Sequence, residues 1–343
     1  MRARPGAVAV LLAALAAAVP AAAQPAATPR VAILTTGGTI ASRAGQSMQD
    51  GQSLVGAVPG LAEVADITVE EITRVGSSQI TPAHWLTIAR RIRALLADPG
   101  LTGIVVTHGT DTLEDTAFFL ELAVDDPRPV VLTGSMRSST EVSADGPANL
   151  LNAVRVAASP AARGMGVLVA LNENIASARD VWKTDNRRVD TFRSPELGYL
   201  GFVDPDGVVF YRRPVAAGDR VAFDLEGRDD LPVVPVLADY PGFDAGLMDG
   251  ALARSPAGVV VAAFAGGRMS AGARAAIERA AAAGVPVVLA SHVPGGRIVG
   301  DPRGGLACVL ARHLPPNKAR ILLMLSLTRT RDLAAIQAIF DRY

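Results

Sequence analysis

Two short turns rich in hydroxyl groups and glycine constrain the fold most, because each directly follows a run of apolar residues. The first turn has the sequence TTGGTI at 35–40 and follows the run 31–34, and the second has the sequence THGTDT at 107–112 and follows the run 104–106. Short apolar runs that end in turn signals indicate buried strands. In an open α/β sheet, the carboxyl ends of the strands open onto one shared crevice. We therefore expect both turns to bring their side chains to the same place.

Strand and helix signals alternate through most of the chain, which predicts an α/β fold. Thr81 and Pro82 form a helix start, with a hydroxyl cap followed by proline at the first helical position. Further strands are expected at 130–132 and 166–170, and Pro147 opens a helix that runs toward Ala158. Half of the residues are hydrophobic but only 4% are aromatic. Such a composition suits helices packed on a mostly parallel sheet.

A break in this alternation divides the chain into two domains, as its length of 343 residues favours. The periodicity fails at 213–232, where prolines, glycines and charges indicate a linker. We predict a larger N-terminal domain at 28–212 with a mostly parallel sheet, and a smaller, flavodoxin-like α/β domain at 233–343. In the smaller domain the expected strands are 233–237, 258–263 and 285–290, and the expected helices are 243–254, 270–283 and 317–327.

The amino terminus has the pattern of a secretory signal peptide. Arg2 and Arg4 precede an apolar run at 7–19, which ends at Pro20 and the small residues 21–23. This order of charged, apolar and small residues is typical of secretory signals, and the apolar run is too short to span a bilayer. We predict a signal peptide over 1–23 and a periplasmic or secreted mature protein that does not bind the membrane. An uncleaved anchor is the alternative.

Charge and cysteine content exclude several classes of function. Basic and acidic residues number 33 each, so no basic face is available for nucleic acid, which needs one to release counterions. Cys308 is the single cysteine, so no disulfide can form within the chain, and no neighbouring residue makes it an obvious nucleophile. No cluster of side chains has the spacing of metal ligands. We expect neither a metal nor another cofactor.

The side chains of the two turns have the composition of a hydrolytic site. Gly37 and Gly38 allow a tight turn that exposes Thr39. A threonine hydroxyl is a weak nucleophile unless a neighbouring base accepts its proton, and the candidates are Thr110, Asp111 and Lys183. Because Lys183 follows the strand expected at 166–170, we expect it at the same edge of the sheet. A lysine beside a hydroxyl and a carboxylate could pass protons through Thr110.

Each of these residues alone also has a simpler structural explanation. A glycine-glycine-threonine turn can be an ordinary strand–helix connection, and Asp111 is a good helix N-cap. Lys183 alone is most simply a solvated surface lysine. His108 is expected to be a packed loop histidine, since its neighbours already supply the reactive hydroxyls. Only the combination, delivered by one sheet, predicts an enzyme.

These residues match a family. The chain resembles the bacterial-type L-asparaginases of the secreted class, which include the glutaminase-asparaginases, over 30–343. The resemblance is specific at TGGTI (36–40), THGTDT (107–112), SADGP (143–147) and RDVWKT (179–184). It implies that Thr39 is the acylated nucleophile, and that Thr110, Asp111 and Lys183 are the family's second hydroxyl, carboxylate and lysine.

The resemblance also implies a substrate and an assembly. The segment at 76–78 matches the one whose serine holds the substrate α-carboxylate, so that Ser77 is the expected contact, and Ser78 stands where well-known relatives carry glutamine. Asp111 would meet the α-amino group. Thr39 would attack the side-chain amide, ammonia would leave, and water would hydrolyse the acyl-enzyme to aspartate, with the Thr110 N–H stabilising the oxyanion. The family's homotetramers of intimate dimers complete each site with the neighbouring subunit's smaller domain.

The chain departs from the family at two places around this site. The lid at 41–53 is shorter and contains no tyrosine, so that Ser42 or Ser47 is left as a replacement for the family's lid tyrosine. The partner subunit usually contributes an asparagine and a glutamate, but the corresponding segments 264–268 and 300–303 contain neither. Asp301 or Arg303 could substitute.

Other functions compete with hydrolysis of L-asparagine. The first keeps the enzyme and changes the amide, to L-glutamine or to both amides. The second is a periplasmic solute-binding protein, which is also secreted and built of two α/β domains, but which gives no reason for the four candidate catalytic residues to converge. A nucleotide-binding enzyme is the third, and the first turn lacks the further glycine and the lysine that cradle phosphates.

Overall fold

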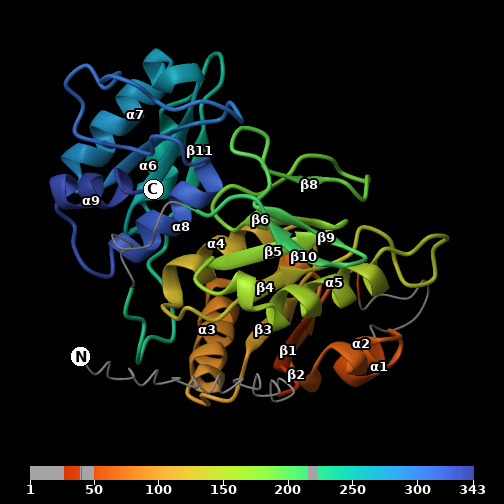
Figure 1. Ribbon diagram of the computed structural model, residues 1–343. Helices are drawn as coiled ribbons and strands as arrows, with labels where there is room; N and C mark the ends of the chain where they lie inside the picture. The colour runs from red at the N-terminus through yellow and green to blue at the C-terminus, as the bar shows by residue number, and fades with distance from the viewer. Residues whose placement is uncertain (1–26, 39, 41–49, 215–222) are drawn as a thin grey trace, which may run out of the picture.

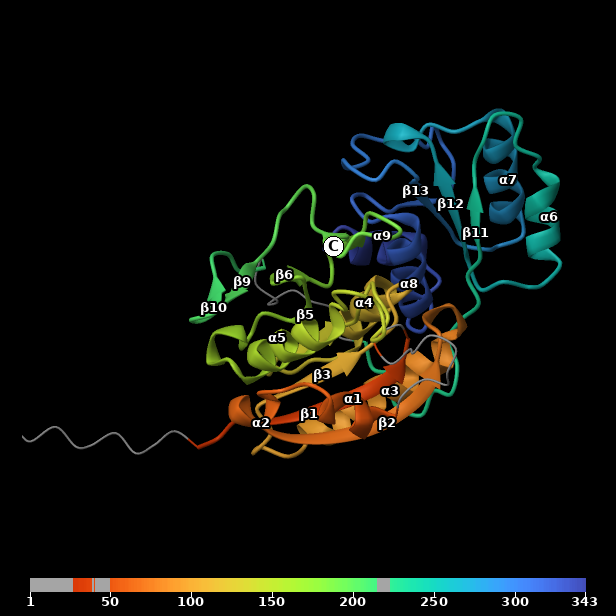
Figure 2. The same cartoon turned by 90° about the vertical axis from the view of Figure 1, so that its right-hand side faces the viewer.

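The structure is a computed structural model that describes residues 27–38, 40, 50–214 and 223–343. Its described part contains a large sheet and a smaller sheet, each covered by helices, and the smaller sheet lies in the C-terminal part of the chain (Figures 1 and 2). The predicted α/β fold with a large, mostly parallel sheet and a smaller second sheet is confirmed. The predicted signal peptide at 1–23 lies outside the described residues.

The large sheet has the strand order β10-β9-β6-β5-β4-β3-β1-β2. The strands from β5 to β2 pair in parallel, whereas β6, β9 and β10 are antiparallel. In the register of the central pair, Thr35 lies opposite Thr107, so the two hydroxyl-rich turns leave the sheet at the same edge. The strands are β1 (Arg30–Gly37), β2 (Asp66–Val75), β3 (Gly103–Thr107), β4 (Val130–Thr133), β5 (Val167–Leu171), β6 (Asn174–Ser177), β9 (Gly201–Asp204) and β10 (Gly207–Phe210).

Helices cover both faces of the large sheet, because its central strands are apolar on both sides. On one face α3 (Pro82–Leu96) and α4 (Leu113–Ala123) pack on alternate residues of the strands. On the other face lie α5 (Gly146–Ala158) and the short helices α1 (Gly51–Gly56) and α2 (Leu61–Val64). The predicted start of α3 is confirmed: Thr81 is its N-cap, and the His84 ring accepts a hydrogen bond from the Thr81 N–H.

The small sheet is wholly parallel in the order β11-β12-β13-β14. Its strands are β11 (Val236–Ala238), β12 (Val259–Ala263), β13 (Val287–Ser291) and β14 (Val309–Leu310). Helices α6 (Gly246–Leu252) and α7 (Ala271–Ala282) pack on one face, and α8 (Pro316–Ser326) and α9 (Leu333–Phe340) on the other. Helix α8 also packs on α4, so that one apolar core runs from the large sheet's helices to the small sheet (Figure 2).

Three features differ from what the sequence predicts or extend it. The strand expected at 233–237 begins only at Val236, because Pro235 has no N–H with which to join the sheet. The long edge strand β2 was not predicted, since its charged residues hide its alternation. Of the predicted linker at 213–232, the described residues include Phe223, which is buried in the core beside α4.

No helix in the described part of the chain is long and apolar enough to cross a membrane.

Candidate active site

The two hydroxyl-rich turns touch each other at their glycines. A Cβ atom on Gly38 would lie 2.3 Å from the Gly109 Cα, and Gly38 has a φ of +84°, so this position requires glycine. On its other side Gly109 lies against Ser77, where an added Cβ would come 2.8 Å from the serine Oγ. The Thr36 hydroxyl donates a hydrogen bond of 2.9 Å to the Thr107 carbonyl. Three segments, which follow β1, β2 and β3, therefore converge at one edge of the large sheet.

Thr39, the expected nucleophile, lies outside the described residues. Its neighbours in the chain are both packed: Gly38 lies on Gly109, and Ile40 is buried, with its Cγ1 3.1 Å from where a Gly146 Cβ would stand. The loop that ends at Gly146 is held by Asp145, whose carboxylate accepts hydrogen bonds from the N–H groups of Met136 and Arg137. This explains the SADGP segment as a structural support beside the first turn.

Lys183, Thr110 and Asp111 form a hydrogen-bonded cluster beside the second turn. The Lys183 ammonium donates to the Thr110 Oγ1 at 3.0 Å and to the Asp111 Oδ1 at 2.7 Å. Thr110 is buried and the Lys183 side chain is 18% exposed, whereas the Asp111 side chain is 66% exposed. The carboxylate is therefore open to a ligand, and the hydroxyl–amine pair is shielded from water. Such a pair can relay a proton to or from a reacting group.

Lys183 reaches this cluster by a route that differs from the predicted one. It does not directly follow the carboxyl end of β5, because β6 pairs antiparallel with β5 and returns the chain to Ser177, opposite Leu168. The chain then leaves the large sheet, and β7 (Trp182–Lys183) pairs only with β8 (Phe192–Arg193) in a separate two-stranded sheet. The Lys183 N–H is held by the Glu114 carboxylate on α4. Lys183 therefore lies near the second turn, as expected, but β7 and Glu114 hold it there, and it does not directly follow β5.

The two serines expected to bind the substrate differ in their surroundings. Ser77 is buried, and its hydroxyl accepts a hydrogen bond of 3.1 Å from the Asp111 N–H. Its carbonyl accepts one of 2.8 Å from the Thr112 hydroxyl. Since a hydroxyl both donates and accepts, the Ser77 O–H can still donate to a ligand. Ser78, the next residue, is exposed.

His108 is a packed structural residue, as the sequence indicates. It is fully buried, and its Nδ1 donates to the Gly109 carbonyl at 2.8 Å. Its Nε2 accepts from the Thr116 hydroxyl at 2.9 Å, and that hydroxyl accepts from the Trp85 indole at 2.8 Å. Burial lowers the pKa of His108 to about 4. The neutral ring therefore holds the second turn in place through its hydrogen bonds and does not act as the catalytic base.

The buried His108 makes the stability of the protein depend on pH. In the unfolded chain a histidine titrates at its usual pKa of 6.5, above the value of about 4 in the fold, so the unfolded state takes up the proton first as the pH falls. Between pH 7 and pH 4 the free energy of unfolding should fall by about 3 kcal/mol more in the wild type than in His108→Asn. Urea unfolding at fixed protein concentration measures this difference. Parallel pH profiles for the two proteins would contradict it.

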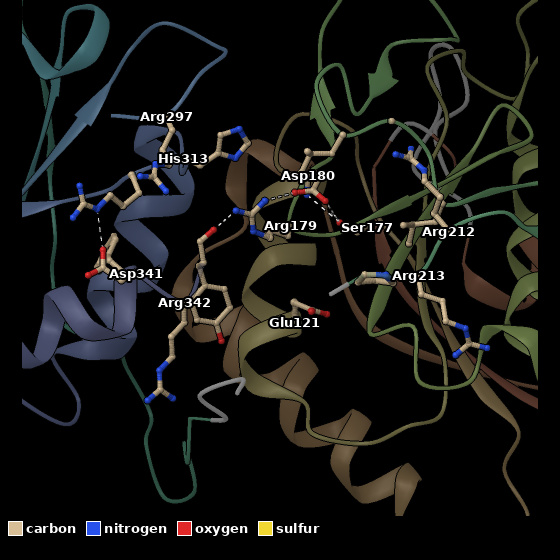
Figure 3. A pocket seen from close by; sticks show the side chains of 17 residues that line it. Glu121, Ser177, Arg179, Asp180, Arg212, Arg213, Arg297, His313, Asp341 and Arg342 are labelled. Carbon is tan, nitrogen blue, oxygen red and sulfur yellow. Dashed lines mark hydrogen bonds and ion pairs between the residues drawn. The ribbon is translucent and has the colours of Figure 1, made fainter. Parts of the chain in front are cut away.

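A cavity of about 1000 Å³ lies between the part of the chain that forms the large sheet and the C-terminal part (Figure 3). The side chains that line it differ from those of the candidate site. Among the charged groups that line it, Arg179 pairs with Asp180 and Arg312 pairs with Asp341. None of the candidate catalytic residues in the described part of the chain lines it. Lys183, Thr110 and Asp111 therefore remain the better candidate site.

Cys308 and the acidic side chains offer no competing site in the described part of the chain. Burial raises the pKa of the Cys308 thiol to about 11, which disfavours the reactive thiolate. Within the described ranges, no group of three or more histidine, cysteine, aspartate or glutamate side chains could hold a metal ion.

Sequence reasoning missed the residues that support Lys183 from behind. Glu114 on α4 accepts the Lys183 N–H and a second hydrogen bond from Asn317 on α8. The neighbouring Lys318 ammonium binds the backbone just before β7. No local pattern marks these residues, because α8 follows Glu114 by about two hundred positions.

Known proteins are similar to this chain over most of its length. The family model described as "Asparaginase, N-terminal" matches residues 30–216, and the one described as "Glutaminase/Asparaginase C-terminal domain" matches 233–340. An "L-asparaginase 2" of Bacillus subtilis is 41% identical, with 92% of this chain and 87% of the relative covered. A "Probable L-asparaginase periplasmic" of Haemophilus influenzae is 40% identical, with 92% and 93% covered.

Two further relatives differ in the names they carry. A "Glutaminase-asparaginase" of Pseudomonas fluorescens is 36% identical, with 99% of this chain and 98% of the relative covered. The crystal structure of a "Probable Cytoplasmic L-asparaginase" from Campylobacter jejuni superposes with a TM-score of 0.88 at 40% identity, with 92% and 100% covered.

Proposed function

The chain belongs to the bacterial-type L-asparaginase family, and from this membership we propose that it hydrolyses the side-chain amide of L-asparagine to L-aspartate and ammonia. Relatives that cover most of the chain are named L-asparaginase, and so is the structural neighbour. The observation that carries the proposal is the contact of the Lys183 ammonium with both Thr110 and Asp111, beside the two packed turns.

The proposed mechanism is a double displacement on Thr39. The Thr39 hydroxyl attacks the side-chain carbonyl carbon, and its proton passes through the Thr110 hydroxyl to Lys183, whose Nζ lies 3.0 Å from the Thr110 Oγ1. In this step Lys183 acts as the neutral amine, and the ammonium so formed returns the proton through Thr110 to the leaving nitrogen. The Thr110 N–H stabilises the oxyanion. Protonation of the leaving nitrogen releases ammonia, and water then attacks the acyl-Thr39 ester, which yields aspartate and restores the hydroxyl.

The remaining candidate residues hold the substrate in this proposal. Asp111 is the exposed carboxylate of the cluster and binds the substrate α-amino group. The Ser77 O–H donates to the α-carboxylate, while the same oxygen keeps its hydrogen bond from the Asp111 N–H. Ser78 lies beside them on the exposed side. No metal or other cofactor takes part in these steps.

The relatives do not agree on whether the substrate is L-asparagine alone or also L-glutamine. The relatives include a glutaminase-asparaginase, and this chain lacks a lid tyrosine. The candidate replacements Ser42 and Ser47 lie outside the described residues. We propose L-asparagine as the preferred amide, with L-glutamine as the alternative.

Ammonia release by the purified protein from L-asparagine and from L-glutamine tests this proposal. We expect turnover of L-asparagine, with a higher kcat/KM than for L-glutamine. A solute-binding protein would instead show saturable binding of the amide in calorimetry and no ammonia. Binding without ammonia from either amide would overturn the proposed function, and a higher kcat/KM for L-glutamine would overturn the proposed preference.

Assembly and location complete the proposal. We propose a homotetramer in which the partner's smaller domain approaches the site, and light scattering of the purified protein tests it. Asp301 and Arg303, the candidate substitutes for the family's partner residues, form an ion pair of 2.7 Å with each other. A periplasmic or secreted location rests on the pattern of residues 1–23 and on the periplasmic relative, whereas the structural neighbour is named cytoplasmic.

A further inference from the structure

The chain uses lysine at only two positions. Of its 33 basic residues, Lys183 and Lys318 are the lysines and all others are arginine. Lys183 belongs to the proposed active site, whereas Lys318 lies on α8 of the C-terminal part and is fully buried. A fully buried lysine is rare unless its charge is paired or bound. An ammonium is also a compact group with three donors, unlike the planar guanidinium of arginine.

Lys318 uses its three donors on the backbone that leads to Lys183. Its Nζ donates to the carbonyls of Ala178, Arg179 and Val181, at 3.1, 2.7 and 2.8 Å. These residues form the turn between β6 and β7, so the last of the three carbonyls lies two positions before Lys183. The three N–H donors of the ammonium match the three carbonyl acceptors, so that one ammonium binds the whole turn.

Asn317, the neighbour of Lys318, supports Lys183 through the Glu114 carboxylate. Its side-chain amide donates to the Glu114 Oε1 at 3.0 Å and to the Asp115 carboxylate at 2.7 Å. The second oxygen of Glu114 accepts the Lys183 N–H at 2.5 Å. Lys318 thus fixes the carbonyls before Lys183, and Asn317 fixes the Glu114 carboxylate that accepts the Lys183 N–H.

We propose that Asn317 and Lys318 form a clamp that positions the Lys183 ammonium against Thr110, so that docking of α8 sets the geometry of the active site. The two residues are positioning residues that act through Lys183 and touch no substrate. This inference rests on the proposed function for its kinetic consequence. Its structural consequence, the placement of Lys183, can be measured without any activity.

The clamp is needed because β7 has little other support. It lies outside the large sheet and pairs with two residues of β8 only. The Lys183–Thr110 hydrogen bond has the ordinary length of 3.0 Å, so its geometry depends on where β7 holds the lysine. Burial lowers the pKa of Lys318 to about 8, and burial beside Glu114 raises the pKa of Asp115 to about 6. Both charged groups are therefore held in a buried position where α8 packs against the chain before β7 and the start of α4.

Two variants test the clamp, with steady-state kinetics on L-asparagine. Lys318→Met keeps the apolar stem of the side chain and removes the ammonium, and we expect kcat to fall about a hundredfold with KM nearly unchanged, because the substrate contacts remain while Lys183 is displaced. Asn317→Ala removes one arm of the clamp and should give a smaller loss of kcat. Ser326→Ala is the matched control: Ser326 is the last residue of the same helix and its hydroxyl donates to the Leu322 carbonyl within that helix, and the kcat of this variant should stay at the wild-type value.

Acetylation of the lysines with an N-hydroxysuccinimide ester, followed by mass spectrometry, provides the readout that needs no turnover. Since Lys318 is fully buried, Lys183 is the side chain that can react in the native protein. We expect Lys183 to be acetylated several-fold faster in Lys318→Met and Asn317→Ala than in the wild type, and at the wild-type rate in Ser326→Ala.

The outcomes separate the clamp from the proposed function. If Lys318→Met folds cooperatively but keeps both the kcat and the Lys183 acetylation rate of the wild type, the clamp is wrong. If Lys318→Met does not fold, Asn317→Ala decides by the same two measurements. If the wild type releases no ammonia from either amide, the proposed function fails, while the acetylation rates still test the placement of Lys183.

Discussion

Thr39→Ala is expected to reduce ammonia release from L-asparagine by roughly 10⁴- to 10⁶-fold, because loss of a covalent nucleophile leaves only the binding and oxyanion contacts. The hydroxyl is the group that forms the acyl bond in the proposed mechanism. The measurement is a coupled ammonia assay with the purified variant, together with a binding measurement to show that the amide still enters the site. KM should change much less than kcat.

A matched control separates the role of this hydroxyl from general damage to the first turn. Thr35→Val removes a neighbouring hydroxyl that is buried and has no hydrogen-bond partner in the described structure, so the variant should fold and keep wild-type turnover. Mass spectrometry of rapidly quenched wild type should find the acyl group on the peptide that contains Thr39. Full activity of Thr39→Ala, or an acyl group on the peptide that contains Thr110, would remove Thr39 as the nucleophile.

Lys183→Met is expected to lower kcat by about a thousandfold, since a positioned acid–base group contributes rate factors of this size. The substitution keeps the length and apolar stem of the side chain and removes the ammonium that contacts Thr110 and Asp111. The loss of stability should be small, because the Asp111 partner is mostly exposed and exposed ion pairs contribute little. Steady-state kinetics and thermal unfolding on the same preparation measure both effects.

Arg193→Met is the control for Lys183→Met. Arg193 lies on β8 opposite Trp182 in the same two-stranded sheet, and its guanidinium binds Asp190 away from the site. Its removal takes a positive charge from the same ribbon without touching Thr110, and turnover should be unchanged. Wild-type turnover of Lys183→Met would exclude Lys183 from the mechanism.

Short-range patterns were sufficient to predict the central part of the fold and the meeting of the two hydroxyl-rich turns. The runs that became β1 and β3 are apolar throughout, so that their burial on both faces can be read locally. The turns that follow them carry hydroxyls and glycines, and the parallel pairing of β1 with β3 then brings them together. The start of α3 was equally local, because a cap and a proline mark it.

The rest depended on contacts between distant parts of the chain. The path of Lys183 could not be predicted, because it is set by the antiparallel pairing of β6 and by side chains on α8 rather than by its own neighbours. The edge strand β2 carries charged residues on its open side, which conceal its pattern. The resemblance to a family identified Lys183 as a candidate catalytic residue, but it did not explain how the chain brings Lys183 to the second turn.

The contacts of Lys318 also set an order of events during synthesis. The Ala178 carbonyl and the Lys318 ammonium are 140 positions apart in the chain. All strands of the large sheet and the proposed catalytic groups precede α8 in the chain, so they are synthesised before it. A nascent chain that ends before α8 therefore carries Thr39, Thr110, Asp111 and Lys183 but lacks the support for the lysine. A chain truncated before α8 should therefore release no ammonia from L-asparagine, even where its large sheet folds.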